Sequence, residues 1–180
     1  MNTGLIAMRY ANALFQLGIK QEGLLTKFYD DCNFLLKTLN GSDELVNFLR
    51  NPVVKPSVKK KFMRDNFHAF FHETTLKFIE MVIDNNREMF FSNIIIDFMT
   101  IYRNHNDIKS VTVTTAIPVD ESFKSKIVGI IEERLKVKVE LNCKVDEGII
   151  GGLVVMIDGK QADGSIAGKL RAMKKKLFLK

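Results

Sequence analysis

Between Leu5 and Asn104 the apolar residues recur at helical spacing, and Pro and Gly are scarce. A stripe at i, i+3, i+4 and i+7 is typical of an amphipathic helix that buries one face. After the polar joint "NHND" the segment "IKSVTVTTAI" alternates β-branched residues in period two, which is the pattern of a half-buried strand. The sequence therefore predicts an all-α part followed by a part with strands, with the boundary near His105.

Six helices joined by short turns are expected in the first part. We place them around the stripe Ile6, Tyr10, Ala13, Leu14 and Leu17, and over residues 24–39, 43–49, 57–67, 73–84 and 87–103. Gly41 suits a helix end and Ser42 the following N-cap. Pro52 disfavours helix before it, and Pro56 suits a first helical turn. Six helices with short joints favour a bundle.

The second part is expected to combine short strands with two helices. The first helix opens at Pro118 or Asp120, and its apolar face holds Phe123, Ile127, Ile130, Ile131 and Leu135. A half-buried strand alternating Val137, Val139, Leu141 and Cys143 follows, then "GLVVMI", a turn, the short strand "QAD" and a helix from about Ser165 to Leu177. The predicted fold class is a two-domain chain, with an all-α six-helix bundle over residues 1–105 and a small α/β domain over 108–180.

The composition indicates an ordered globular protein, because 46% of the residues are hydrophobic and charges of both signs are interspersed. No apolar run approaches a bilayer-spanning length, and the N-terminal residues lack the features of a signal or transit peptide. A bacterial cytosolic location is therefore expected. Cys32 and Cys143 lie far apart without a C-x-x-C partner, so both are predicted to be reduced, structural residues.

The net charge of +6 raises the possibility of nucleic-acid binding, and six of the last twelve residues are basic. A basic helix end also complements the helix dipole and keeps a solvated face. Phe178 is the one aromatic residue interleaved there, whereas single-strand binders stack bases on several. A nucleic-acid-binding module that uses this basic helix is kept as the alternative function.

No catalytic, cofactor or metal site is predicted. His68 and His72 stand at i, i+4 in "HAFFH", but no third ligand is evident. The run "GIIGG" precedes a strand rather than a helix, and "ADGSIAG" lacks the lysine of a phosphate loop. Ser165 has no strained elbow motif, and no His lies in the second part, so a catalytic triad cannot form there.

The glycine-rich run "GIIGGLVVMIDGKQADGSIAGKL" is instead explained by conformation. Asp158-Gly159 is a hairpin signal, because a type I′ turn needs positive φ at both central residues. Asp163 or Ser165 can cap the final helix. Gly151 and Gly152 suit either a bulge or a close approach of another backbone, and the sequence leaves these two roles open.

Three segments resemble one family along the whole chain: "RYANALF" (9–15), "LRNPVV" (49–54) and "VDEGIIGGLVVMIDGKQADGSIAGKL" (145–170). They are similar to the delta subunit of bacterial F-type ATP synthase, a relative of the mitochondrial oligomycin-sensitivity-conferring protein. The most specific part is the signature that contains Gly151, Gly152, Asp163, Gly164 and Ser165. One departure is Glu147, where relatives often carry Pro.

The resemblance implies a non-catalytic stator component. It links the catalytic head to the peripheral stalk, so that proton-driven rotation is coupled to ATP synthesis. The expected partners are the N-terminal helix of the alpha subunit, bound by the bundle, and the end of the stalk's b subunit, bound by the second domain. No cofactor, nucleic acid or small-molecule substrate is implied. The expected location is the cytoplasmic face of the bacterial inner membrane, reached through the complex.

The resemblance also places the alpha-subunit helix in a groove between the first and fifth helices. Such a groove holds a helix through apolar anchors at i, i+3, i+4 and i+7. The candidates carried onto this sequence are Tyr10, Ala13, Leu14, Leu17, Leu76, Ile79, Val82 and Ile83. The alternative for each is that it faces the bundle's own core.

Overall fold

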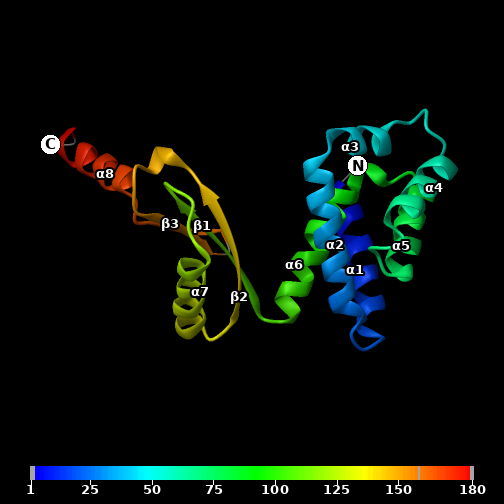
Figure 1. The fold of residues 1–180 in the computed structure, drawn as a ribbon, viewed down its shortest axis with the longest axis horizontal. Coiled ribbons are helices and arrows are strands. Elements are labelled where there is room, and N and C mark those ends of the chain that lie inside the picture. Colours follow the sequence, from blue (N-terminus) through cyan, green and yellow to red (C-terminus); the bar gives the residue numbers. More distant parts are fainter. Residues whose placement is uncertain (1–2, 158, 179–180) are drawn as a thin grey trace. The chain divides into compact units, whose positions relative to one another are not determined.

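The computed structural model describes residues 3–157 and 159–178, and the chain divides into two compact units, Met1–Tyr102 and Arg103–Lys180 (Figure 1). The first unit is helical, and the second combines a small sheet with helices. The predicted two-part fold class is therefore confirmed.

Among the described residues, each of the six predicted helices of the first part is present. They are α1 (Thr3–Ile19), α2 (Leu24–Gly41), α3 (Asp43–Arg50), α4 (Pro56–Phe67), α5 (Glu73–Asp84) and α6 (Phe91–His105). The boundary signals act as expected, since Ser42 Oγ accepts a hydrogen bond from the Leu45 N–H and Pro56 opens α4. The sixth helix differs at its start, where a 3₁₀ turn, η1 (Glu88–Phe90), precedes α6.

The second unit contains a four-stranded mixed sheet in the order β2-β1-β3-β4. Its strands are β1 (Ile108–Thr115), β2 (Lys138–Val145), β3 (Leu153–Ile157) and β4 (Lys160–Asp163). Helix α7 (Glu121–Leu135), capped by Asp120, joins the parallel pair β1 and β2, and β3 runs antiparallel to β1. A 3₁₀ turn, η2 (Glu147–Ile149), precedes β3, and α8 (Ile166–Phe178) follows β4.

The core of the second unit is small. Its buried residues, among those described, are Val111, Val113, Thr115, Ile149 and Ser165. Two sequence expectations are therefore wrong: Cys143 is exposed, and Ile130 and Leu135 on the expected inner face of α7 are also exposed. The reason for Cys143 is its position on β2, an edge strand with only one neighbour. Cys32 is buried in the bundle, and burial, with the Asp31 charge as a second cause, raises the pKa of its thiol well above the usual value.

A buried carboxylate on α2 fixes the start of α5. Asp31 Oδ2 accepts hydrogen bonds from the His72 backbone N–H and from the Thr75 hydroxyl. His72 in turn caps α5, because its Nδ1 accepts from the Thr74 N–H. A helix N-terminus carries free N–H groups and positive partial charge, which a carboxylate satisfies. The polar link therefore sets the position of α5 within the first unit.

A second buried polar link joins α4 to η1. Lys59 Nζ forms an ion pair with Glu88 Oε1, and the two side chains are only 2% and 9% exposed. The other oxygen, Glu88 Oε2, is buried and has no hydrogen-bond partner among the described residues. Taking both charges from water is costly, and their attraction offsets this only while both partners stay in place.

We predict that Lys59→Met lowers the free energy of unfolding by about 3–5 kcal/mol, because it leaves the Glu88 carboxylate buried without a counter-ion. The double variant Lys59→Met/Glu88→Leu should be more stable than this single variant, since both charges are gone. Urea unfolding followed by helical circular dichroism measures the difference. The control is Lys60→Met, which removes the more exposed pair with Asp84; an equal loss in Lys59→Met and this control contradicts the prediction.

Candidate partner-binding site

Five of the eight groove candidates are core residues in this structure. Their side chains are at most 1% exposed, and they pack in the bundle's main apolar cluster: Leu14, Leu76, Ile79, Val82 and Ile83. A partner helix cannot reach them unless the bundle opens. These five residues were expected to line the groove, but they lie on the inner faces of α1 and α5 and are buried.

The other candidates lie at the surface. Tyr10 and Ala13 line a pocket of about 370 Å³ between α1 and α5, and Leu17 is 41% exposed further along α1. The Tyr10 ring is half-buried and stands edge-to-face to Phe78 of α5, with ring centroids 6.3 Å apart. This contact joins the two helices while leaving the pocket open to solvent.

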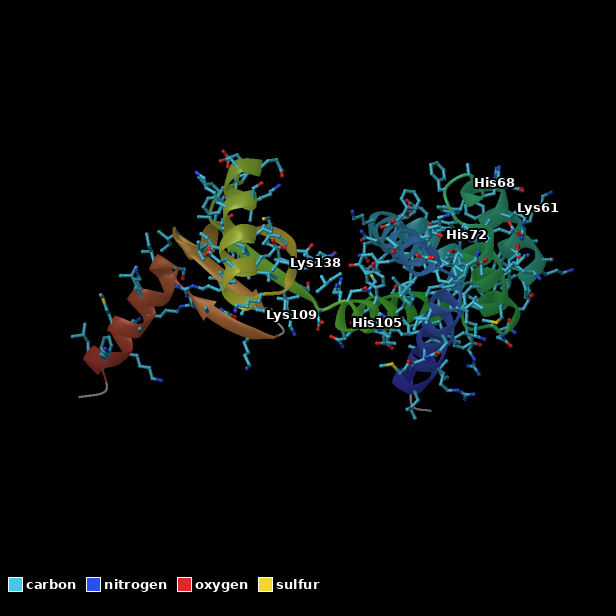
Figure 2. All side chains as sticks on the ribbon, turned by 90° about the horizontal axis from the view of Figure 1, so that it is seen from below. Lys61, His68, His72, His105, Lys109 and Lys138 are labelled. Atoms are coloured by element: carbon cyan, nitrogen blue, oxygen red, sulfur yellow. The ribbon has the colours of Figure 1, made fainter. Side chains whose placement is uncertain are left out.

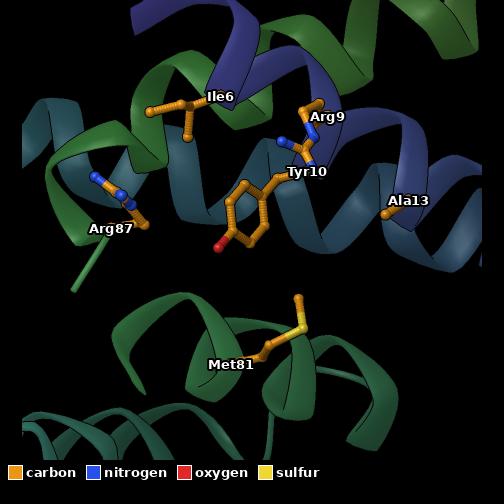
Figure 3. A pocket seen from close by; sticks show the side chains of 6 residues that line it. All are labelled: Ile6, Arg9, Tyr10, Ala13, Met81 and Arg87. Atoms are coloured by element: carbon orange, nitrogen blue, oxygen red, sulfur yellow. The ribbon is translucent and has the colours of Figure 1, made fainter. Parts of the chain in front are cut away.

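Four further residues line the same pocket and were not among the candidates (Figure 3): Ile6, Arg9, Met81 and Arg87. Ile6 belongs to the expected apolar stripe of α1, whereas Arg9 lies off it and Arg87 lies between α5 and η1. Two sequence signals could have pointed to Arg9: it begins the segment "RYANALF", and the first acidic residue of the chain is Glu22. The pocket thus has apolar walls and two cationic groups.

The carboxylates of α5 are directed toward α4 rather than toward this pocket. Glu80 Oε1 lies 2.8 Å from Arg64 Nη2, and Asp84 Oδ1 lies 2.6 Å from Lys60 Nζ. The hydrogen bond and charge of Glu80 raise the pKa of the Arg64 guanidinium, with a smaller contribution from Glu73. The α1 side of α5 is therefore left without an acidic side chain from α5.

The glycine-rich signature forms a joint between two loops of the second unit. Gly152 has φ +78°, and a Cβ on it would lie 2.6 Å from the Gly164 carbonyl oxygen. The Gly164 N–H donates to Leu153 O, and the Ile166 N–H donates to Gly151 O, each at 3.0 Å. Of the two roles left open by the sequence, close approach of another backbone is therefore the one that Gly152 has.

Ser165 starts α8 from inside this joint. Its buried hydroxyl accepts a hydrogen bond from the Gly168 N–H at 2.9 Å and donates to Asp163 Oδ1 at 2.6 Å. Asp163 Oδ1 also accepts from the Ser165 N–H. These two bonds, the hydroxyl first, lower the pKa of Asp163. Ser165 is thus the N-cap, and Asp163 orients it, so neither is arranged as a nucleophile or a base.

The expected turn at Asp158-Gly159 is described only in part. Asp158 lies outside the described residues, while Gly159 has φ +79°, and a Cβ on it would meet no atom within 4 Å. The positive φ at Gly159 is what a type I′ turn between β3 and β4 requires.

The histidines have structural partners rather than metal geometry. Figure 2 shows His68 and His72 at the turn between α4 and α5, where His68 Nδ1 lies 3.2 Å from Arg64 O and His72 caps α5. Nowhere in residues 3–157 and 159–178 do three His, Cys, Asp or Glu side chains come together as a metal site would require. None of the described helices combines the length and apolar composition needed to cross a membrane.

Comparison with known proteins identifies the family. The family model of the ATP synthase delta (OSCP) subunit matches residues 6–177. The chain belongs to the ATP synthase delta (OSCP) subunit family. Among its relatives, the ATP synthase subunit delta of Desulforamulus reducens is 31% identical, with 100% of this chain and 99% of that protein covered. The corresponding subunit of Gloeobacter violaceus is 29% identical over 97% of this chain and 95% of that protein.

One further relative and one solved structure extend the comparison. The sodium-ion-specific ATP synthase subunit delta of Ilyobacter tartaricus is 27% identical, covering 92% of this chain and 94% of that protein. A chain of the Toxoplasma gondii mitochondrial ATP synthase hexamer has a TM-score of 0.74 at 21% identity, over 96% of this chain and 97% of that chain. At that identity the likeness shows a shared fold. These comparisons give no support to the nucleic-acid alternative.

We predict that Gly152→Ala destabilises the second unit more than Gly159→Ala does. Both positions have positive φ, so each substitution costs about 1–2 kcal/mol for the left-handed backbone. Only Gly152 faces a backbone oxygen, and the overpacking adds roughly 1–3 kcal/mol. Unfolding followed through NMR signals of β3 measures both variants, and equal losses contradict the close-approach role.

Proposed function

We propose that this chain is a stator component of a bacterial F-type ATP synthase, where it links the catalytic head to the peripheral stalk. The observation that carries this proposal is the match to the delta (OSCP) family over residues 6–177. A static connector holds the head while the central shaft turns, so that proton-driven rotation is coupled to ATP synthesis. The chain itself carries out no catalysis and acts at the cytoplasmic face of the inner membrane through the complex.

In this proposal the first unit binds the N-terminal helix of the alpha subunit. The pocket between α1 and α5 supports this assignment, because Ile6, Tyr10, Ala13 and Met81 offer apolar contacts along two neighbouring helices. Leu17 continues the exposed apolar row of α1. A helix laid along such a row places its own anchors at i, i+3, i+4 and i+7.

The second unit binds the end of the stalk's b subunit in the same proposal. Helix α8 supports this, since its exposed apolar residues repeat at helical spacing along one face: Ile166, Leu170, Met173 and Leu177. An unpartnered apolar stripe of this kind marks a surface for another helix. Two separate contacts within one assembly raise each other's effective concentration, so moderate affinities suffice for firm retention.

We predict that Ala13→Trp weakens binding of the alpha-subunit N-terminal peptide to the full chain. Ala13 is exposed and lines the pocket, so an indole ring there fills the space that the peptide needs. The dissociation constant should rise by about tenfold or more, which corresponds to about 1.4 kcal/mol. Calorimetric titration measures it.

The matched control for Ala13→Trp is Asn93→Trp, an equally bulky change at an exposed position of α6 outside the pocket. It should leave the dissociation constant unchanged. Saturable peptide binding that Ala13→Trp does not weaken would rule out this pocket, and absence of binding by the unaltered chain at millimolar peptide would rule out the alpha-subunit contact.

For the second contact, we predict that Leu170→Asp abolishes binding to the soluble part of the b subunit. Leu170 is exposed, so the substitution should change the stability of the free chain by no more than about 0.5 kcal/mol. Ala172→Asp is the matched control, because it adds the same charge at an exposed position off the apolar face of α8. Analytical ultracentrifugation separates the outcomes, and equal loss in both variants refutes the assigned face.

A further inference from the structure

The pocket between α1 and α5 contains two cationic groups and no anionic one. Arg9 and Arg87 line it together with Ile6, Tyr10, Ala13 and Met81 (Figure 3). Among the described residues, neither guanidinium has an ion pair within this chain. We propose that the helix bound here carries a carboxylate that pairs with Arg9 and Arg87. This inference rests on the proposed function, since it concerns the chemistry of the partner at that groove.

None of the described residues that line this pocket is acidic. Residues 1–21 contain Arg9 and Lys20 but neither Asp nor Glu. On α5, Glu80 and Asp84 are engaged by cations of α4. The remaining neighbour, Glu88, follows Arg87 directly in sequence, but its carboxylate turns inward to Lys59. Among the described residues, Glu80, Asp84 and Glu88 are thus each paired with a cation other than these arginines.

Two arginines are suited to a carboxylate in particular. The planar guanidinium presents a fork of N–H donors that matches the two oxygens of Asp or Glu, and such charge-assisted bonds are stronger than neutral ones. An ion pair at an exposed surface contributes little. Here the apolar pocket wall and the docked helix would exclude water around the pair, which strengthens the attraction.

The position of the arginines adds orientation to the apolar contacts. Ile6 and Arg9 lie in the first half of α1, and Arg87 follows the end of α5, whereas Ala13 and Leu17 continue toward the other end of the groove. An apolar row alone lets a helix slide by a turn or reverse. A carboxylate held at one end fixes both the register and the direction of the partner, because a misplaced helix leaves the charges unpaired.

The test is titration of the full chain with the alpha-subunit N-terminal peptide of the same organism, and with that peptide after each Asp and Glu is replaced by its amide. For the double variant Arg9→Gln/Arg87→Gln, we expect the dissociation constant of the acidic peptide to rise about tenfold at about 50 mM salt. The affinity of the unaltered chain should fall between about 50 and 500 mM salt, while that of the double variant stays nearly constant. The amide peptide lacks the carboxylate, so it should bind the unaltered chain and the double variant with the same, weaker affinity. The reason is that the amide peptide and the double variant each remove the same interaction, the one between the carboxylate and the arginines.

The double variant Lys126→Gln/Arg134→Gln is the matched control, since both residues are exposed on α7 in the second unit and two positive charges are again removed. It should keep the affinity of the unaltered chain; an equal loss would assign the effect to overall charge and overturn the inference. Binding by the double variant within twofold of the unaltered chain also overturns it, while leaving the groove as the peptide site. If the unaltered chain binds neither peptide at millimolar concentration, the proposed alpha-subunit contact fails, and this inference with it.

Discussion

Burial of the inner faces of α1 and α5 is the interaction on which both the bundle and its groove depend. Leu14 on one helix and Ile79 and Val82 on the other are almost fully removed from water, and each such side chain stabilises the fold by about 1.5–3 kcal/mol. The core takes Leu14 of α1 and most of the large apolar residues of α5. The outer edge of the contact between α1 and α5 holds Tyr10, the small residue Ala13 and the flexible Met81. These side chains suit reversible contact with another helix.

Much of the fold could be predicted because the signals are local. Helical and strand periodicity identified the six helices of the first part and the four strands of the second, and cap residues such as Ser42 and Pro56 set their ends. Burial was predicted less well, since it depends on what a neighbour covers. Cys143 alternates correctly within β2, yet it lies on an edge strand of a unit with a small core.

The groove shows the same limit more sharply. Helical spacing defines an apolar face, but it does not tell which side of that face the neighbouring helices cover. Val82 and Met81 are adjacent in sequence, yet Val82 is buried and Met81 is exposed. Arg87 belongs to no helix, so no periodic pattern could assign it to the pocket. The role of Gly152 likewise could not be predicted from the sequence. The atom that leaves no room for a Cβ there belongs to Gly164, twelve residues further along the chain.

The joint at the base of α8 connects this helix to the middle of the sheet through backbone hydrogen bonds. A pull on α8 reaches β3 through the Ile166–Gly151 and Gly164–Leu153 backbone hydrogen bonds. From β3 it passes across five paired residues to β1, the strand that follows α6 along the chain. Strand ladders loaded along their length resist by sharing force among many bonds. A load on α8 is thus carried by backbone groups, which do not depend on the side chains at the surface of this helix.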